Sequence, residues 1–168
     1  LDISRAIATI SYKQDGVFYR RQSFVSHPDQ VFVYKLSASE PRSISFDLLL
    51  DRPERSTTTS CGENELVIAG QLNDGKKDET GVRFAVRVMA LSKDAVLGIE
   101  ENRLKVRNAT NVVLLVCAAS DLQSLTLNPI EDPSQWTRTR LDDAEIQSYD
   151  ALLNRHVDDY RRYYDRVK

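Results

Sequence analysis

The chain has 168 residues, of which 41% are hydrophobic and 29% are charged, and its formal net charge is −2. This composition is typical of a globular domain that is long enough to bury one core. The slightly acidic balance gives no reason to expect a nucleic-acid partner, which would favour a basic surface. No window approaches the ~18 apolar residues of a membrane-spanning helix, so no membrane partner is expected either. The sequence shows no leader pattern, and any signal peptide is expected to lie outside it or to have been removed.

The stretch Ile7–Leu36 contains three alternating apolar runs that are separated by two polar breaks, Lys13–Gly16 and Ser26–Gln30. The first break ends in Asp15-Gly16, and an Asp-Gly pair between alternating apolar residues is a strong hairpin signal. The stretch is therefore predicted to form a three-stranded antiparallel meander.

Six further runs have the length and apolar content of strands, and the clearest is Gly81–Leu91. There Val82, Phe84, Val86 and Val88 alternate with Arg83, Ala85, Arg87 and Met89, which is the period of a half-buried strand. The continuously apolar run Val112–Ala119 indicates a strand that is buried on both faces. The remaining runs are Ile44–Leu50, Leu66–Leu72, Ala95–Ile99 and Arg103–Val106, with polar loops predicted over Asp51–Asn64 and Asn73–Thr80. About nine short strands without an intervening helix favour an antiparallel β-sandwich over residues 1–130.

The pattern becomes helical after Asp132, so residues 131–168 are predicted to be a separate helical segment. One helix is expected over Gln135–Ile146 and a second over Ser148–Val167. The second has an apolar and aromatic stripe at helical spacing, formed by Tyr149, Leu152, Leu153, His156, Tyr160, Tyr163 and Val167. We predict that this stripe is an interface that packs on the sandwich or on a following domain. The alternative is that its tyrosines stack on sugars.

The sequence contains no convincing catalytic or cofactor-binding constellation. The adjacent acids Glu63/Glu65, Glu100/Glu101 and Asp142/Asp143 are interpreted as solvated charges. His27 and His156 are the only histidines, and each is better explained by local hydrogen bonding than by a relay. The isolated glycines form no phosphate loop, and we expect neither a metal nor a cofactor.

The two cysteines do not form a Cys-x-x-Cys pair, so a zinc site is not expected. Cys117 ends an apolar run and is predicted to be a buried thiol, whereas Cys61 lies in a polar loop. A disulfide between them remains open at this stage.

Several segments, in this order, resemble the N-terminal β-sandwich domain of the inverting α-L-fucosidases of glycoside hydrolase family 95, together with the helical linker that follows it. They are Leu1–Tyr12, Asp15–Val17, Arg21–Leu36, Gly81–Phe84, Val112–Ala119 and Ser148–Val167. No single motif decides the resemblance, which depends on the order of the segments. The related maltose-phosphorylase-like family is the fallback.

The resemblance implies a supersandwich-like (galactose-mutarotase-like) fold and a parent enzyme that releases L-fucose from fucosylated oligosaccharides. It also implies that the catalytic residues lie in an (α/α)6 barrel beyond Lys168, so no catalytic residue is assigned to any position of this chain. In that family the sandwich begins well before the segment that matches Leu1. The chain is therefore expected to be a fragment whose intramolecular partner is that barrel. An extracellular or periplasmic location is implied in the same way.

Two other functions remain open from the sequence. The first is a stand-alone carbohydrate-binding sandwich, and the second is a protein-interaction sandwich unrelated to sugars. Because earlier strands of the family are absent, the run Ile7–Tyr12 is predicted to lie at a sheet edge, where it could support a homodimer.

Overall fold

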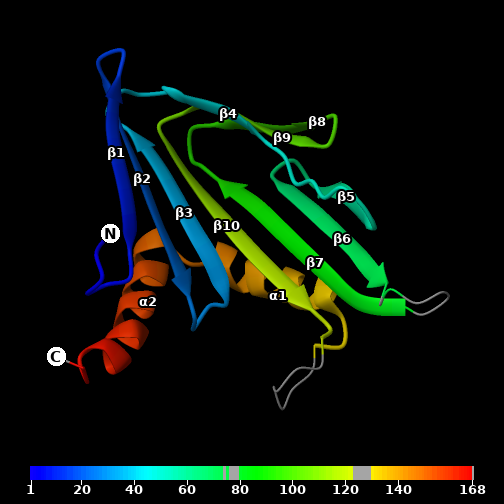
Figure 1. The fold of residues 1–168 in the computed structure, drawn as a ribbon. Helices are drawn as coiled ribbons and strands as arrows, with labels where there is room; N and C mark the ends of the chain where they lie inside the picture. The colour runs from blue at the N-terminus through cyan, green and yellow to red at the C-terminus, as the bar shows by residue number, and fades with distance from the viewer. Residues whose placement is uncertain (74, 76–79, 123–129, 168) are drawn as a thin grey trace.

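The computed structural model describes residues 1–73, 75, 80–122 and 130–167. It contains ten strands and two helices, arranged in layers that Figure 1 shows. The strands are β1 (Ala8–Gln14), β2 (Val17–Ser26), β3 (Val31–Ala38), β4 (Ile44–Leu48), β5 (Ser56–Cys61), β6 (Glu65–Asn73), β7 (Thr80–Leu91), β8 (Val96–Glu100), β9 (Arg103–Ala109) and β10 (Asn111–Ser120). The helices are α1 (Pro133–Glu145) and α2 (Tyr149–Tyr164).

The strands form two antiparallel sheets that face each other. The larger sheet has seven strands in the order β1-β2-β3-β10-β7-β6-β5, and the smaller has three in the order β4-β9-β8. The predicted Asp-Gly hairpin joins β1 to β2, with Gln14 opposite Val17. Asp15 and Gly16 have φ values of 50° and 85°, which is the left-handed backbone of a tight hairpin turn. The expected mostly-β antiparallel sandwich is confirmed.

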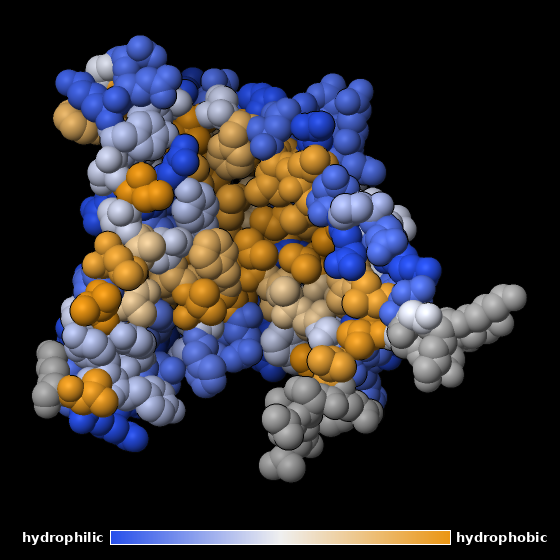
Figure 2. Space-filling view, in the orientation of Figure 1, coloured by the Kyte–Doolittle hydropathy of each residue, from blue (hydrophilic) through white to orange (hydrophobic). Residues whose placement is uncertain are grey.

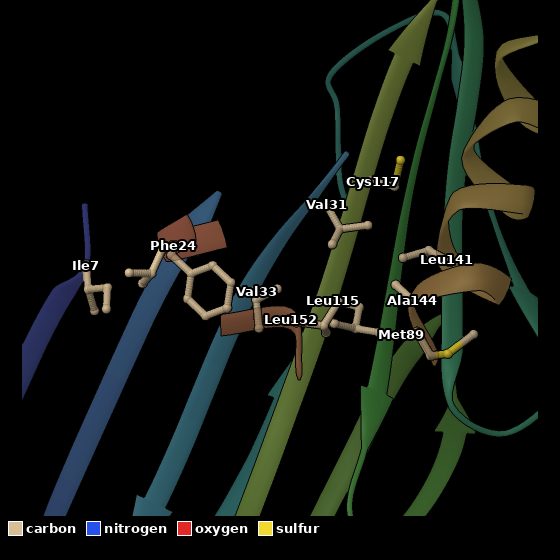
Figure 3. Packing of buried hydrophobic residues seen from close by; sticks show 11 residues of the cluster. Ile7, Phe24, Val31, Val33, Met89, Leu115, Cys117, Leu141, Ala144 and Leu152 are labelled. Carbon is tan, nitrogen blue, oxygen red and sulfur yellow. The ribbon is translucent and has the colours of Figure 1, made fainter. Parts of the chain in front are cut away.

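The seven-stranded sheet separates two hydrophobic cores, one on each of its faces. The inter-sheet core lies between the two sheets and includes Leu66, Leu104 and Leu114. The helix-side core lies between the large sheet and the helices, where Phe24, Leu115 and Leu152 meet (Figure 3). Leu114 and Leu115 are neighbours on β10 and belong to different cores, so β10 is buried on both faces, as the continuous apolar run predicts.

The structure adds one strand to the nine predicted. Strand β5 lies within the stretch predicted to be a loop, because its residues Ser-Thr-Thr-Thr-Ser-Cys lack an apolar alternation. It pairs with β6 at the outer edge of the large sheet, and polar side chains are common on edge strands. Gly70 allows this approach, because a Cβ at Gly70 would lie 1.9 Å from the Arg55 carbonyl oxygen.

The other predicted strands and helices are present in the described residues, with small shifts in their bounds. Strand β1 forms one edge of the large sheet, as predicted for the run Ile7–Tyr12. Helix α1 begins two residues earlier than predicted because Asp132 caps it and Pro133 occupies its first turn. Ser148 caps α2, which ends three residues before Val167. The predicted loop 73–80 and the end of the chain at residue 168 lie largely outside the described residues.

Candidate functional site

Helix α2 carries six of the seven residues predicted to form an interface, and Val167 follows three residues after its end. The structure divides the seven into two groups. The first group packs on this chain's own sheet: Leu152 and His156 are buried, and Tyr149 and Leu153 contact the helix-side core. Tyr160 is half-buried beside them. The second group is exposed, with Tyr163 at 61% and Val167 at 82%. Only the C-terminal end of the stripe is therefore free to contact another domain.

His156 fastens the start of the chain to α2. Its Nε2 lies 2.9 Å from the carbonyl oxygen of Arg5 and 3.2 Å from that of Ala6. Both partners are acceptors, so Nε2 carries the proton and donates. The ring stacks on Phe24 with 4.8 Å between centroids. One turn further along, the Tyr160 hydroxyl donates to the Ile3 carbonyl oxygen at 2.8 Å. Both side chains thus hold the N-terminal segment in place.

The other histidine, His27, does not complete a nucleophilic relay. Its Nδ1 lies 3.3 Å from a carboxylate oxygen of Asp159 on α2. The nearby Ser26 hydroxyl donates to Asp29 instead, and Arg155 binds the same carboxylate at 2.9 Å. These contacts link the β2–β3 turn to α2, and they bring no serine hydroxyl to an imidazole.

One acid is placed differently from its prediction. Glu65 was expected to be solvated, but it is only 4% exposed and forms a buried ion pair with Arg87 on β7. Arg87 Nε also donates to the Ser134 carbonyl oxygen at 3.4 Å, so this pair joins the sheet to the start of α1. Burial of Glu65 follows from its place on the helix-covered face of β6 and from its partner. The other acid pairs are exposed, and Glu100, Asp142 and Asp143 each face a basic side chain.

The cysteines are separate and free. Cys117 is buried in the helix-side core, and burial raises the pKa of its thiol to about 11. Cys61 is half-buried on β5, where Arg138 Nη1 donates to its sulfur at 3.4 Å. The disulfide that the sequence left open is absent. Within the described ranges, no three His, Cys, Asp or Glu side chains gather closely enough to hold a metal ion, and no helix is long and apolar enough to cross a membrane.

The structure reveals a cleft that sequence reasoning missed. It lies between β4 and the strands β1, β2 and β3, and it has a volume of about 560 Å³. Tyr12 and Tyr19 form one wall, with ring centroids 5.1 Å apart and planes 19° apart. Leu36 and Leu114 contribute apolar surface. Figure 2 shows apolar surface gathered in a hollow in the middle of this face. Tyr19 and Arg21 are two residues apart on β2 and so share one face, but no local pattern signals that β4 lies over that face.

Two hydrogen bonds fix the aromatic wall of the cleft. Arg21 Nη2 donates to the Tyr12 hydroxyl at 2.9 Å, and the guanidinium carbon lies 5.2 Å from the centre of the same ring. The Tyr19 hydroxyl donates to the Ser43 carbonyl oxygen at 3.3 Å, which ties the large sheet to the segment before β4. The cleft is therefore preformed.

Taken together, the fold and side chains define a β-sandwich with a helical cover and without an evident catalytic centre among the residues described. Residues 1–125 match the family model described as "Glycosyl hydrolase family 65, N-terminal domain". The chain belongs to this family, which confirms the predicted N-terminal sandwich domain of a glycoside hydrolase.

Curated relatives extend the comparison to α-fucosidases, as the sequence resemblance indicated. "Alpha-L-fucosidase 2" of Arabidopsis thaliana is 28% identical over 99% of this chain. "Probable alpha-fucosidase A" of Aspergillus niger is 26% identical over 99% of this chain. In each case the match covers only 22% of the relative, so the chain spans about a fifth of the length of these proteins.

A solved structure shares the fold. It is assigned as a kojibiose phosphorylase from the human microbiome, and it matches with a TM-score of 0.61 over 98% of this chain and 22% of its own. Its sequence identity is 14%, so the likeness shows the fold alone.

Proposed function

We propose that this chain is a non-catalytic N-terminal segment of a longer α-L-fucosidase. The observation that carries the proposal is the match to the Arabidopsis fucosidase, which is 28% identical along 99% of this chain while covering 22% of the relative. The remaining length of such a parent would hold the (α/α)6 catalytic barrel. The parent would remove terminal L-fucose from fucosylated oligosaccharides by hydrolysis with inversion.

The arrangement of acidic side chains favours a non-catalytic role for this chain. Inverting glycosidases need two carboxyl groups that face each other across roughly 6.5–9.5 Å, one as acid and one as base. Among the described residues, Glu65 is neutralised by the buried Arg87, and the exposed Asp142 and Asp143 face Arg138 and Arg140 along α1. These contacts stabilise the domain, and they do not present a pair to a sugar.

The C-terminal end of α2 is the proposed contact with the barrel. Tyr163 and Val167 are exposed there, and Val25 on the neighbouring β2 is 65% exposed. Val25, Tyr160 and Tyr163 line one shallow cavity, so these side chains form a single surface. An apolar surface that rigid strands and a helix hold in place suits a stable domain interface.

Activity measurements test the proposal. The chain alone should not release fucose from 2′-fucosyllactose, whereas the parent should release it without phosphate and with the inverted anomer first. A parent that cleaves its substrate only when phosphate is present would instead be a phosphorylase. Cell fractionation of the parent tests the extracellular or periplasmic location, which is part of the same proposal.

Matched substitutions test the interface. Tyr163→Ala should leave the stability of this chain unchanged and should lower the stability of the parent, because only the parent has a barrel to cover Tyr163. Arg162→Gln, on the exposed face of the same turn, serves as the control in both proteins. Equal effects of Tyr163→Ala in the chain and the parent would contradict a contact with the barrel.

A stand-alone carbohydrate-binding module is the second candidate, and the tyrosine-walled cleft is the observation that favours it. Trp136 does not contribute to such a surface, because it packs against the helix-side core with Arg140 5.2 Å from its ring centre. A homodimer through the edge strand β1 is a further proposal, and light scattering of the purified chain would detect it.

A further inference from the structure

We propose that the cleft between β4 and β1–β3 binds a hexuronic acid residue of an acidic glycan, with the sugar carboxylate on Arg21. The inference goes beyond the proposed function, because the cleft lies in the sandwich itself and the reaction of the parent does not require it. It is carried by the charge of Arg21, by the shape of the cleft and by the rigidity of its aromatic wall.

Arg21 supplies positive charge to the cleft, which it lines as a half-buried side chain. Its guanidinium contacts Tyr12, and no carboxylate within the described part of the chain forms an ion pair with it. Asp47 on β4 also borders the cleft, but Lys105 and Arg107 bind its two oxygens at 2.7 and 2.5 Å. Those two cations hold the pKa of Asp47 below its usual range. Arg21 is thus a partly desolvated cation that retains donors for an anion.

The cleft also has the size and the apolar surface to hold a sugar ring. A volume of about 560 Å³ lies within the range of small-ligand pockets. Leu36 and Leu114 offer apolar surface opposite Phe46 and Leu48 of β4, and the tyrosine pair closes one side. A pyranose ring has apolar C–H faces and polar edges, and the carboxylate of a hexuronic acid lies on one such edge. A ring seated on the apolar surface would therefore direct its carboxylate toward Arg21.

Arg20 also borders the cleft, but it is the neighbour of Arg21 on β2, so its side chain lies on the opposite face of the sheet. The one guanidinium on the cleft face favours a carboxylate over a phosphate. Phosphate carries more than one negative charge near neutral pH, and its sites use several basic or backbone donors. A carboxylate carries one charge and matches one guanidinium in a two-point contact. Because hydrogen bonds already fix the Tyr12 and Tyr19 hydroxyls, little side-chain ordering opposes binding.

Calorimetric titration of the chain with methyl β-D-glucuronide tests the proposal, with methyl β-D-glucoside as the matched neutral ligand. We expect saturable binding of the glucuronide, and binding of the glucoside that is weaker by about tenfold or more, since charge-assisted hydrogen bonds supply the difference. Arg21→Gln should lower the affinity for the glucuronide by a similar factor, whereas Arg162→Gln on α2 should leave that affinity unchanged.

Several outcomes would overturn the proposal. They are equal binding of both glycosides, no saturable binding of the glucuronide, and full retention of binding by a folded Arg21→Gln variant. Cyclohexanecarboxylate binding as tightly as the glucuronide would show a general carboxylate site and would remove the sugar assignment. If Arg21→Gln fails to fold, Tyr12→Phe provides the test, because it removes the hydroxyl that positions Arg21. This variant should bind the glucuronide more weakly and the glucoside as before. Fucose release by the parent is measured separately, so failure of this inference and failure of the proposed function are distinguishable.

Discussion

Replacing Leu152 by alanine measures how firmly α2 is docked on the sheet of this chain. Leu152 is 1% exposed and lies in the helix-side core beside Phe24 and Leu115. Truncation of a buried leucine removes its transfer free energy and leaves a cavity, so we expect the free energy of unfolding to fall by about 3 kcal/mol. For a chain of this length, that corresponds to a decrease in Tm of roughly 6–12 °C.

Urea unfolding, monitored by the fluorescence of Trp136, is the appropriate assay, because Trp136 is the single tryptophan of the chain and packs against the same core. Tyr163→Ala, on the exposed end of the same helix, is the control and should change stability by less than about 0.5 kcal/mol. If Leu152→Ala destabilises the chain no more than Tyr163→Ala does, then α2 is not docked in the isolated chain and the division of its stripe is wrong.

Three further predictions address individual side chains. Arg87→Met should lower the free energy of unfolding by about 3–5 kcal/mol because it leaves Glu65 buried without a partner, and adding Glu65→Leu should restore much of that loss in a double-mutant cycle. His156→Leu keeps an apolar side chain but removes the donor to the Arg5 carbonyl, so it should cost about 1–3 kcal/mol and increase amide exchange in residues 2–7. Cys117 has its pKa raised to about 11, whereas the unfolded thiol, with a pKa near 9.0, releases its proton first. The free energy of unfolding should therefore decline as pH rises from 9 toward 11, and it should decline less in Cys117→Ala. Identical pH profiles for the two proteins would contradict the raised pKa of the Cys117 thiol.

Local signals in the sequence were sufficient for most of the fold. Asp15-Gly16 predicted the first hairpin because few residue pairs tolerate its left-handed backbone, and the period of two in Gly81–Leu91 identified β7. Strand β5 was missed because its polar residues resemble a loop, and only pairing with β6, which the absent side chain of Gly70 permits, makes it a strand. Pairing between distant segments cannot be read from a local pattern.

The candidate site was less predictable, because it depends on which face each strand presents. The sequence identified the stripe on α2 but could not tell that Leu152 and His156 pack on this chain while Tyr163 does not. Glu65 looked solvated because its partner, Arg87, is 22 residues away on the next strand. The cleft depends on the position of β4 over β1–β3, which no short-range pattern specifies.

The most direct test of the proposed function compares fucose release by this chain and by its parent on 2′-fucosyllactose under identical, phosphate-free conditions. We expect release by the parent, with the inverted anomer formed first, and no turnover by the chain alone at any concentration. Turnover by the purified chain, or a parent that cleaves its substrate only by phosphorolysis, would contradict it.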